Sequence, residues 1–518
     1  MKYDSTSVKS QYSKCEDNRE PFLRRARKAS SLTLPFLIAP DGHTGASDLP
    51  TPYQSMGARG VTNLAAKLLL ALLPPDNPFF RYDVDKFQQE EFSESEKVQF
   101  DKILSDVETS VMNFIESSPI RTAAFEMLKH LIVGGNVLIH YQSEKDKSDL
   151  RVFGVDRYIV KRAPTGKALE IIVKEMVVPN ALSQEILEHC QVKPDSGDSY
   201  NKPIQMYTKV WWDNMDNKYH VSQHINDIVV PDSEGTYTEN NVPFRALRLH
   251  RIDGESYGRG LVEQYLGDLI SLESLHESIV KASAAAAKVI FLLAPNGVTK
   301  ADDLNKAPTG AFRTGNAEDV ATIQMGKYND FRVALETINR IEARLSSAFM
   351  LRESVQRDAE RVTAEEIRYM ATELDEAQGG IYSILAQEWQ LPLVHIVTQD
   401  MTKKKLLPAL PKQLLTPVIT TGLDALGRTN DLIKLDNMVE RVFTLDPQLA
   451  DKYINMGEYL RRRGSALKVE TDGLLKSEEQ VQAQQQAEQQ QQMMQQGIPN
   501  AVSQIGQMAQ QQQQKQTK

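Results

Sequence analysis

Two long helical patterns separated by a short irregular stretch constrain the fold of this chain more than any other feature of its sequence. A glycine-rich turn, DGESYGRG (253–260), opens the first pattern, whose apolar residues recur at helical spacing from Leu261 to Ile279. An insert at 289–328 follows, and a second pattern at 330–349 again places its apolar residues on one face. The segment therefore predicts a hairpin of two helices with a small folded head between them.

Composition narrows the class of protein. A chain of 518 residues is too long for one hydrophobic core, so about two to four domains are expected. The formal net charge of −9 is not that of a chain that binds nucleic acid over its whole surface. Its two cysteines, Cys15 and Cys190, exclude a zinc cluster and a disulfide framework, which favours a reducing compartment. The apolar run at 64–75 is too short to span a bilayer and no signal peptide is visible, so no membrane partner is predicted.

Outside the hairpin, helical and strand patterns occur in separate blocks, which predicts an α+β, helix-rich fold. A charged helix is expected at 1–30, and a connector rich in proline and glycine at 31–54. Further helices are predicted at 55–73, 95–117, 121–134, 183–191, 429–443 and 447–463. Strands are predicted at 137–142, 151–155, 157–163, 168–178, 206–213, 218–225, 244–252 and 416–422. From about residue 479 the chain is rich in glutamine and is expected to be mostly disordered.

The residues after the second long helix are predicted to form a separate loop. Thr363 and Glu366 make a capping box, which starts a new helix that continues to about residue 400, with a kink at Gly379–Gly380. The loop before it carries three arginines that could contact DNA phosphates at a constriction: Arg352, Arg357 and Arg361. Three acidic residues in the same loop cancel this charge, so a solvated, self-paired loop is the competing interpretation.

The first long helix carries a surplus of acidic side chains. Four carboxylates stand against one lysine: Glu263, Asp268, Glu273 and Glu277 against Lys281. An exposed helix face explains such a surplus without any function. If several copies of the helix lined a channel, however, the net charge would repel DNA and discourage sticking.

No catalytic motif stands out in the chain. A Walker A pattern is missing, and the glycine string at 254–260 is not a dinucleotide-binding fingerprint. A metal-dependent nuclease could use Asp195 with Asp216 and Lys218, because that chemistry needs two carboxylates and a lysine around a divalent ion. The residues DNMDNK (213–218) lie between two strand patterns, so a hairpin turn explains them better. No enzyme activity, cofactor or metal is therefore predicted.

Several long segments together resemble the portal, or head-to-tail connector, proteins of short-tailed, autographivirus-type bacteriophages. The resemblance extends over roughly residues 5–445 and fades in the glutamine-rich part. It is carried by TPYQSMGARGVTNLAAKLLLALLPP (51–75), LKHLIVGGNVLIH (128–140), RIDGESYGRGLVEQYLGDLISLESLHESIVK (251–281), RIEARLSSAFML (340–351), ERVTAEEIRYMATELDEAQGGIYSILAQEWQLPLV (360–394) and TTGLDALGR (420–428).

The resemblance implies a non-enzymatic homo-oligomeric ring, usually a dodecamer, at one vertex of the capsid. Each subunit would consist of the following regions: wing (1–256 and 364–426), stem helices (257–288 and 329–350), clip (289–328), tunnel loop (351–363), crown helices (427–478) and glutamine-rich tail (479–518). The three arginines of the tunnel loop would face DNA, and the four carboxylates of the first stem helix would line the channel. Three cations of the clip would contact DNA or the packaging motor, although a solvated surface explains them equally well: Lys300, Lys306 and Arg313.

The resemblance also implies the partners and the location of the protein. The expected partners are further copies of the chain, double-stranded DNA in transit, the terminase large subunit, a tail adaptor protein, the major capsid and scaffolding proteins, and internal core proteins. ATP hydrolysis would belong to the separate terminase, and the expected location is the portal vertex of the virion, with the host cytoplasm during assembly. Two alternatives stay open: a metal-dependent nucleic-acid enzyme and a passive structural protein of the capsid interior.

Overall fold

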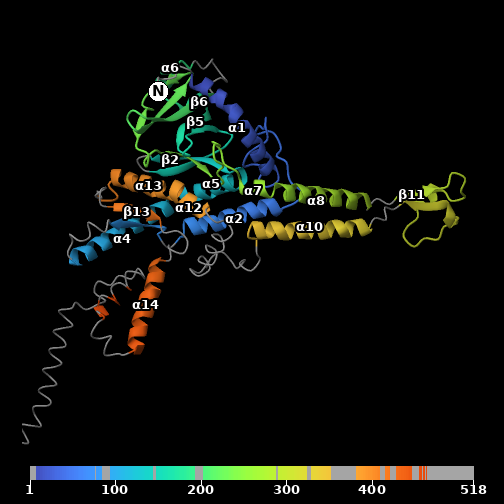
Figure 1. Cartoon of the computed structure of the whole chain (residues 1–518). Coiled ribbons are helices and arrows are strands. Elements are labelled where there is room, and N and C mark those ends of the chain that lie inside the picture. Colours follow the sequence, from blue (N-terminus) through green and yellow to red (C-terminus); the bar gives the residue numbers. More distant parts are fainter. Residues whose placement is uncertain are drawn as a thin grey trace, which may run out of the picture. The chain divides into compact units, whose positions relative to one another are not determined.

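The computed structural model divides the chain into two compact units, Met1–Leu423 and Asp424–Lys518, and each unit is described by itself. Figure 1 shows their helices and strands, coloured along the sequence. The structure describes residues 7–75, 78–84, 94–143, 147–192, 202–286, 290–323, 328–351, 381–408, 415–419 and 427–445, with a few positions between 454 and 463.

Helices form the larger hydrophobic core of the first unit, where α2 and α5 pack against each other. Four helices were predicted in this part of the chain from the helical spacing of their apolar residues, and all four are present. At the end of α5 the chain turns at Gly135, which has φ of 70° and whose Cβ would lie 2.2 Å from the backbone of Arg259. The four helices are α1 (Val8–Ser31), α2 (Met56–Leu72), α4 (Glu94–Ser117) and α5 (Ile120–Gly134).

Two antiparallel sheets make up the strand-rich part of the first unit. In one sheet the strand order is β10-β2-β3, and in the other it is β4-β5-β6-β7-β8, with β9 paired to β7. The strands are β2 (Asn136–Ser143), β3 (Ser148–Gly154), β4 (Tyr158–Arg162), β5 (Ala168–Val177), β6 (Ile204–Asp213), β7 (Lys218–Ile225), β8 (Ile228–Val229), β9 (Gly235–Tyr237) and β10 (Phe244–Arg248). Between β5 and β6 lie a 3-10 turn and a short helix, η1 (Pro179–Ala181) and α6 (Gln184–His189).

Both faces of the larger sheet are covered, as β5 shows. Ile171 and Val173 of β5 belong to a core shared with the smaller sheet, whereas Ile172 belongs to a core that contains Tyr12 of α1. Successive side chains of a strand point to opposite faces, so a strand buried on both faces is apolar at consecutive positions. The predicted strands of this region are confirmed, although β10 ends at Arg248 rather than at residue 252.

One strand pair joins distant parts of the chain and was not predicted as a pair. Strand β1 (Phe80–Val84) runs antiparallel to β13 (Leu415–Ile419), with Phe80 opposite Ile419. A strand was predicted at 416–422, but none at 80–84. The strand at 80–84 was missed because it has only five residues and its partner is more than 300 residues away, so the nearby sequence contains no pattern that indicates the pairing.

The predicted hairpin of long helices is present, with one correction. The first helix is not continuous: α7 (Leu261–Gln264) ends at Tyr265, and α8 (Leu266–Ala286) begins after it. The Tyr265 ring packs toward Phe349, with 6.0 Å between ring centroids, so tertiary packing overrides the helical pattern at this position.

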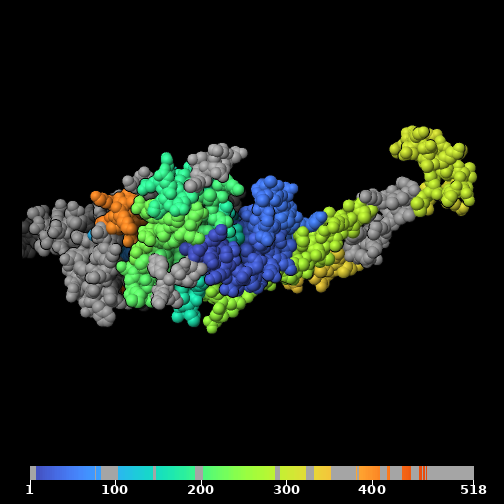
Figure 2. Space-filling model, turned by 90° about the horizontal axis from the view of Figure 1, so that it is seen from above, coloured from blue at the N-terminus to red at the C-terminus, as the bar shows by residue number. Residues whose placement is uncertain are grey.

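The second helix of the hairpin, α10 (Tyr328–Ala348), lies antiparallel to α8, because Asp268 at the start of α8 pairs with Arg344 near the end of α10. Contacts also join α7 to α1 and α10 to α2. Figure 2 accordingly shows N-terminal segments (blue) beside the start of the helix pair (yellow-green).

The insert between the two helices contains a two-stranded antiparallel sheet. Strand β11 pairs with β12 from Ile290 opposite Ile323 to Leu293 opposite Val320. A small folded head was predicted here, and the paired strands confirm that the insert is folded. The elements of the insert are β11 (Ile290–Leu293), α9 (Ala301–Asn305), η3 (Ala317–Asp319) and β12 (Val320–Ile323).

The last helices of the first unit include a turn of π-helix. The elements are α12 (Ile381–Leu385), the π turn η5 (Ala386–Gln390) and α13 (Leu391–Lys403). Pro392 has no N–H for the carbonyl four residues earlier, and a wider turn just before it accommodates this loss. The predicted helix start at Thr363 and the predicted kink at Gly379–Gly380 lie outside the described residues.

The second unit contributes helix α14 (Gly427–Leu445), which confirms the helix predicted at 429–443. Tyr459 donates a hydrogen bond of 2.5 Å to Asp436 of this helix. The glutamine-rich tail lies outside the described residues, as does most of the helix predicted at 447–463. Within the part of the chain that the structure describes, no helix is both long and apolar enough to cross a membrane.

Candidate functional site

Two of the four acidic residues of the first long helix are paired with arginines of the same chain. Glu263 lies 2.9 Å from Arg259 and 3.2 Å from Arg25, and Asp268 lies 2.7 Å from Arg344. Arg25 comes from α1 and Arg344 from α10, so these pairs join separate elements. The sequence count of acidic charge on this helix did not include those arginines.

The other two acidic residues are also engaged within the chain. Glu273 accepts hydrogen bonds from the backbone N–H groups of Tyr53 (2.9 Å) and Gln54 (3.2 Å), so it holds the loop that precedes α2. Glu277 pairs with Lys281 one helical turn later, at 2.6 Å. All four carboxylates therefore have partners in the subunit, and their orientation toward a channel stays a prediction.

Two of the cations in these pairs are held more firmly in the charged form. Hydrogen bonds to Glu255 and then to Glu263 outweigh the opposite effect of burial and raise the pKa of Arg259. A hydrogen bond to Glu277 raises the pKa of Lys281 in the same direction. Arg259 and Lys281 therefore both carry their positive charge at neutral pH.

The three predicted cations of the insert are exposed to solvent. Lys300 precedes α9, Lys306 follows it, and Arg313 lies in the loop between α9 and η3. Among the residues that the structure describes, no ion pair forms to any of them. The structure thus places them where another molecule could reach them, and it does not bring them together into one cluster.

One carboxylate organises the loops of the insert. Asp319 accepts hydrogen bonds from the N–H groups of Val298 (2.8 Å) and Thr299 (3.1 Å) and from the Thr299 hydroxyl (3.1 Å). A Cβ at Gly297 would lie 2.6 Å from this carboxyl group, which explains why a glycine occupies this position. Phe312, beside Arg313, has no cover at all, with a relative exposure of 102%.

The arginines predicted to contact DNA lie just beyond the described chain. Arg352, Arg357 and Arg361 are all outside the described residues, and α10 can be followed only to its end and on to Leu351. The left-handed turn after this helix was not predicted from the sequence. Glycine usually marks such a turn, whereas here Met350 takes the left-handed conformation, with φ of 55°.

The residues proposed for a nuclease are not assembled as such. Asp195 is outside the described residues, and Asp216 and Lys218 belong to the turn between β6 and β7, where Asp213 is opposite Lys218. Each aspartate of this turn uses one oxygen to accept a backbone N–H two residues later, from Met215 and from Lys218. The predicted hairpin turn is therefore confirmed.

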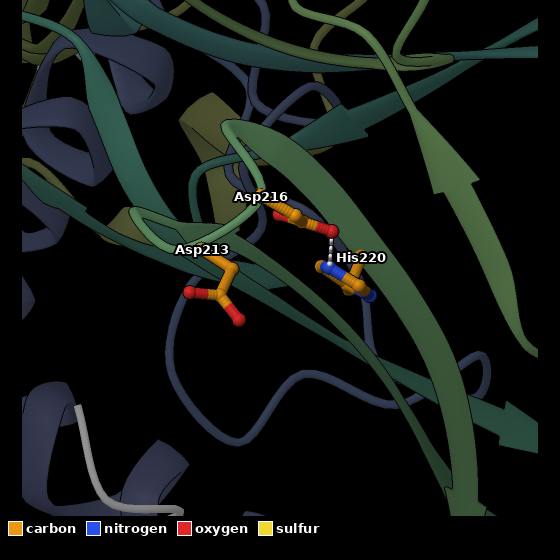
Figure 3. A group of neighbouring side chains, drawn as sticks. All are labelled: Asp213, Asp216 and His220. Atoms are coloured by element: carbon orange, nitrogen blue, oxygen red, sulfur yellow. Dashed lines mark hydrogen bonds and ion pairs between the residues drawn. The ribbon is translucent and has the colours of Figure 1, made fainter.

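The same turn brings Asp213 and Asp216 next to His220, as Figure 3 shows. The possible ligand atoms of the three residues lie within 4.8 Å of one another, and His220 is 2.9 Å from Asp216. The strand register creates this cluster, since Trp211 of β6 is opposite His220 of β7. Asp216 is exposed and the other two residues are half-buried, and two acidic turn residues beside a histidine form such a cluster without any ion.

Comparison with known proteins identifies the family. A model of the family described as bacteriophage head to tail connecting protein matches residues 5–475. The portal protein of Escherichia phage T7 is 40% identical over 481 residues, covering 92% of this chain and 89% of that protein. The portal protein of Enterobacteria phage T3 is 38% identical over 480 residues, which again cover 92% of this chain and 89% of that protein.

Among solved structures, the neck of an empty GTA particle is similar over 80% of this chain and 90% of that one. Its TM-score is 0.38 at 11% identity, which is too low to support a conclusion. The relatives by sequence are portal proteins, structural components rather than enzymes, so the predictions of a portal function and of no enzyme activity are confirmed. With a family model over most of its length and two portal proteins at about 40% identity, the chain belongs to the family of bacteriophage head-to-tail connecting proteins.

Proposed function

We propose that copies of this chain form a closed ring, a dodecamer, at one vertex of the capsid, and that double-stranded DNA passes through its channel during packaging and ejection. In this ring α8 and α10 form the stem, the insert at 289–328 forms the clip, and residues 351–363 form the tunnel loop. We assign residues 1–256 and 364–426 to the wing, 427–478 to the crown and 479–518 to the glutamine-rich tail. Family membership supports the proposal, and the α8–α10 pair is the observation that carries it.

The charges of this helix pair suit a channel through which DNA must slide. The acidic side chains of the first long helix are paired with cations or backbone N–H groups of the same subunit, as described above. A surface whose charges are already compensated does not hold phosphates by releasing counterions, nor does it repel them strongly. Contact with DNA would then be left to the tunnel loop, where we place Arg352, Arg357 and Arg361.

The clip suits contact with other proteins. Four large apolar side chains of the insert are strongly exposed: Leu292 (48%), Val298 (82%), Leu304 (41%) and Phe312 (102%). Apolar surface of this kind commonly marks an interface. We assign the insert, with Lys300, Lys306 and Arg313, to contact with the terminase large subunit during packaging and with the tail adaptor afterwards. The major capsid, scaffolding and internal core proteins are assigned to other surfaces of the ring, which assembles in the host cytoplasm.

Electron microscopy of the purified full-length protein tests the ring. We expect annular particles with a hole on the axis wide enough for a DNA duplex. Particles without such a hole would support a passive structural protein of the capsid interior instead. A protein that stays monomeric under all assembly conditions would contradict the proposal.

The DNA contact has its own test. We expect the triple variant Arg352→Ala, Arg357→Ala and Arg361→Ala to form rings but to lower the yield of genome-containing particles in infected cells. The matched control is Arg340→Ala, since Arg340 is an exposed arginine of α10 that is paired with Glu336 at 2.6 Å. Equal yields for the triple variant and the control would remove these arginines from DNA contact.

A further inference from the structure

The end of α10 is built as a complete Schellman motif around an unusual residue. Phe349 N–H donates to Leu345 O (2.9 Å), and Met350 N–H donates to Ser347 O (3.2 Å). Leu351 N–H then reaches back to Ser346 O (2.7 Å). The residue in the left-handed position is Met350, with φ of 55°, although side chains with a Cβ are strained in this conformation. Other contacts must therefore stabilise the turn.

Helix α2 supplies those contacts through two polar side chains. Lys67 Nζ donates to the carbonyl oxygen of Met350 at 2.7 Å. Asn63 Nδ2 donates to the same oxygen at 3.1 Å and to the carbonyl oxygen of Phe349 at 3.3 Å. Lys67 is only 8% exposed, so its ammonium group is directed at the end of α10 rather than at solvent. The last carbonyls of a helix carry partial negative charge, which a cation at this place compensates.

The same helix end is packed tightly against two further elements. Phe349 is fully buried, and a Cβ at Gly60 of α2 would lie 2.6 Å from its ring. On another side the ring faces Tyr265, the residue at the break between α7 and α8. The end of α10, the start of α8 and the middle of α2 therefore meet at one side chain. Because such packing allows little free volume, a shift of any of the three displaces the others.

We propose that Asn63 and Lys67 are positioning residues that fix the direction in which the chain leaves α10. They act through the carbonyl oxygen of Met350, and they touch no DNA themselves. Their consequence for DNA rests on the function proposed above, in which the segment that follows Leu351 contains the tunnel loop. A loop that contacts moving DNA must leave its helix in a fixed direction. If that direction varied, the arginines of the loop would occupy many different positions.

Hydrogen–deuterium exchange of the full-length protein tests the positioning role directly. The amides of Met350 and Leu351 are hydrogen-bonded within the turn, so their exchange reports its opening. In a Lys67→Met variant, which keeps the side-chain volume, we expect their exchange to accelerate about tenfold, the effect of one lost hydrogen bond to a charged group. Asn63→Ala, which loses only neutral hydrogen bonds, should accelerate it about fivefold.

The control is Thr62→Ala on the same helix, whose exposed hydroxyl donates to Ala58 O at 2.8 Å and has no other partner within the described ranges. Amides in the middle of α10, such as that of Ile341, should keep their exchange rates in all three variants. Faster exchange along the whole of α10 would show general destabilisation and overturn the positioning role. Unchanged exchange of the Met350 and Leu351 amides in Asn63→Ala would also overturn the positioning role. Because Asn63→Ala is the milder variant, it tests the proposal even if Lys67→Met does not fold.

Genome retention separates this proposal from the function on which it rests. If exchange changes as expected and the yield of filled particles falls for both Asn63→Ala and the triple arginine variant, both proposals are supported. If exchange changes but neither yield falls, the positioning role stands and the DNA-contacting role of the segment is wrong. If exchange does not change, the positioning role is wrong whatever the yields are.

Discussion

A single buried carboxylate, Asp400 of α13, joins the last helix of the first unit to the hairpin of β2 and β3. It is 6% exposed and accepts hydrogen bonds from Tyr141 Oη (2.9 Å), Ser148 Oγ (2.7 Å) and Ser143 Oγ, while Lys404 Nζ lies at 3.1 Å. Burial alone would raise the pKa of Asp400, but these hydrogen bonds, that from Ser143 most of all, hold the pKa below its usual range. The ionised form is therefore the one that the fold stabilises.

Replacing Asp400 by asparagine keeps the shape of the side chain and removes its charge. The amide nitrogen would then face hydroxyl donors, and the ammonium of Lys404 would lose its anionic partner. Hydrogen bonds to charged groups are worth about 1.5–3 kcal/mol each, and breaking a buried charged pair costs about 3–5 kcal/mol. We expect Asp400→Asn to lower the free energy of unfolding by about 3–5 kcal/mol at neutral pH.

Urea denaturation at equal protein concentration measures this loss. Trp389 is buried in the π turn before α13, so tryptophan fluorescence, to which Trp211 and Trp212 also contribute, reports unfolding of the first unit. The control is Thr402→Ala on the same helix, which loses a hydrogen bond to Thr398 O within the helix. A loss below about 1 kcal/mol for Asp400→Asn, or one equal to that of the control, would refute the reasoning.

The acid dependence of the same variant gives a second check. Because the pKa of Asp400 is lower in the folded state, its contribution is present above the unfolded-state pKa of about 4. That contribution is lost as the pH falls through the folded-state pKa. The difference in stability between wild type and Asp400→Asn should therefore shrink in strong acid.

Three further predictions follow from single contacts. Gly60→Ala should lower stability by about 1–3 kcal/mol in thermal or urea unfolding, because the new methyl group would meet the buried Phe349 ring. Burial first, and a neighbouring lysine second, lower the pKa of His130 to about 4, so the unfolded state binds more protons between about pH 6.5 and 4. Stability should fall as the pH is lowered through this range, and urea titrations of a His130→Phe variant should lack this part of the pH dependence. Arg344→Ala should cost less than about 1 kcal/mol in the same assay, because its ion pair with Asp268 is largely exposed.

Local features of the fold could be predicted from the sequence because their causes are local. Gly135 ends α5 in a left-handed turn that glycine adopts without strain, and the DNMDNK turn between β6 and β7 follows from its aspartates and asparagines. The break at Tyr265 could not be predicted, because this residue continues the apolar stripe of the helix and its contact with Phe349 joins residues that are distant in sequence. The end of α10 was predicted to within one residue, at 349 against Ala348, but its left-handed turn was not, since methionine is a good helix former and Asn63 and Lys67 come from another helix.

The same limit applies to the candidate site. The acidic residues of the first long helix could be found by counting, but the ion pairs of Glu263 with Arg25 and of Asp268 with Arg344 join residues that are distant in sequence. A pattern read along one helix contains no information on which cations the fold brings to it. The exposure of Lys300, Lys306 and Arg313 was predicted correctly, because a short insert of mixed polarity has little interior in which to bury long charged side chains.

The pairing of β1 with β13 also sets a time at which the subunit can be completed. Ribosomes add about 5–20 residues per second, so roughly 15–65 s separate the synthesis of the two strands. During this interval the edge of β1 has no native partner, while α8, the insert and α10 have already been made. A nascent chain therefore lacks a finished first unit until residue 419 has been added. Until then the unpaired edge of β1 is open to pairing with other strands, so a partly made chain is more prone to association than the finished unit.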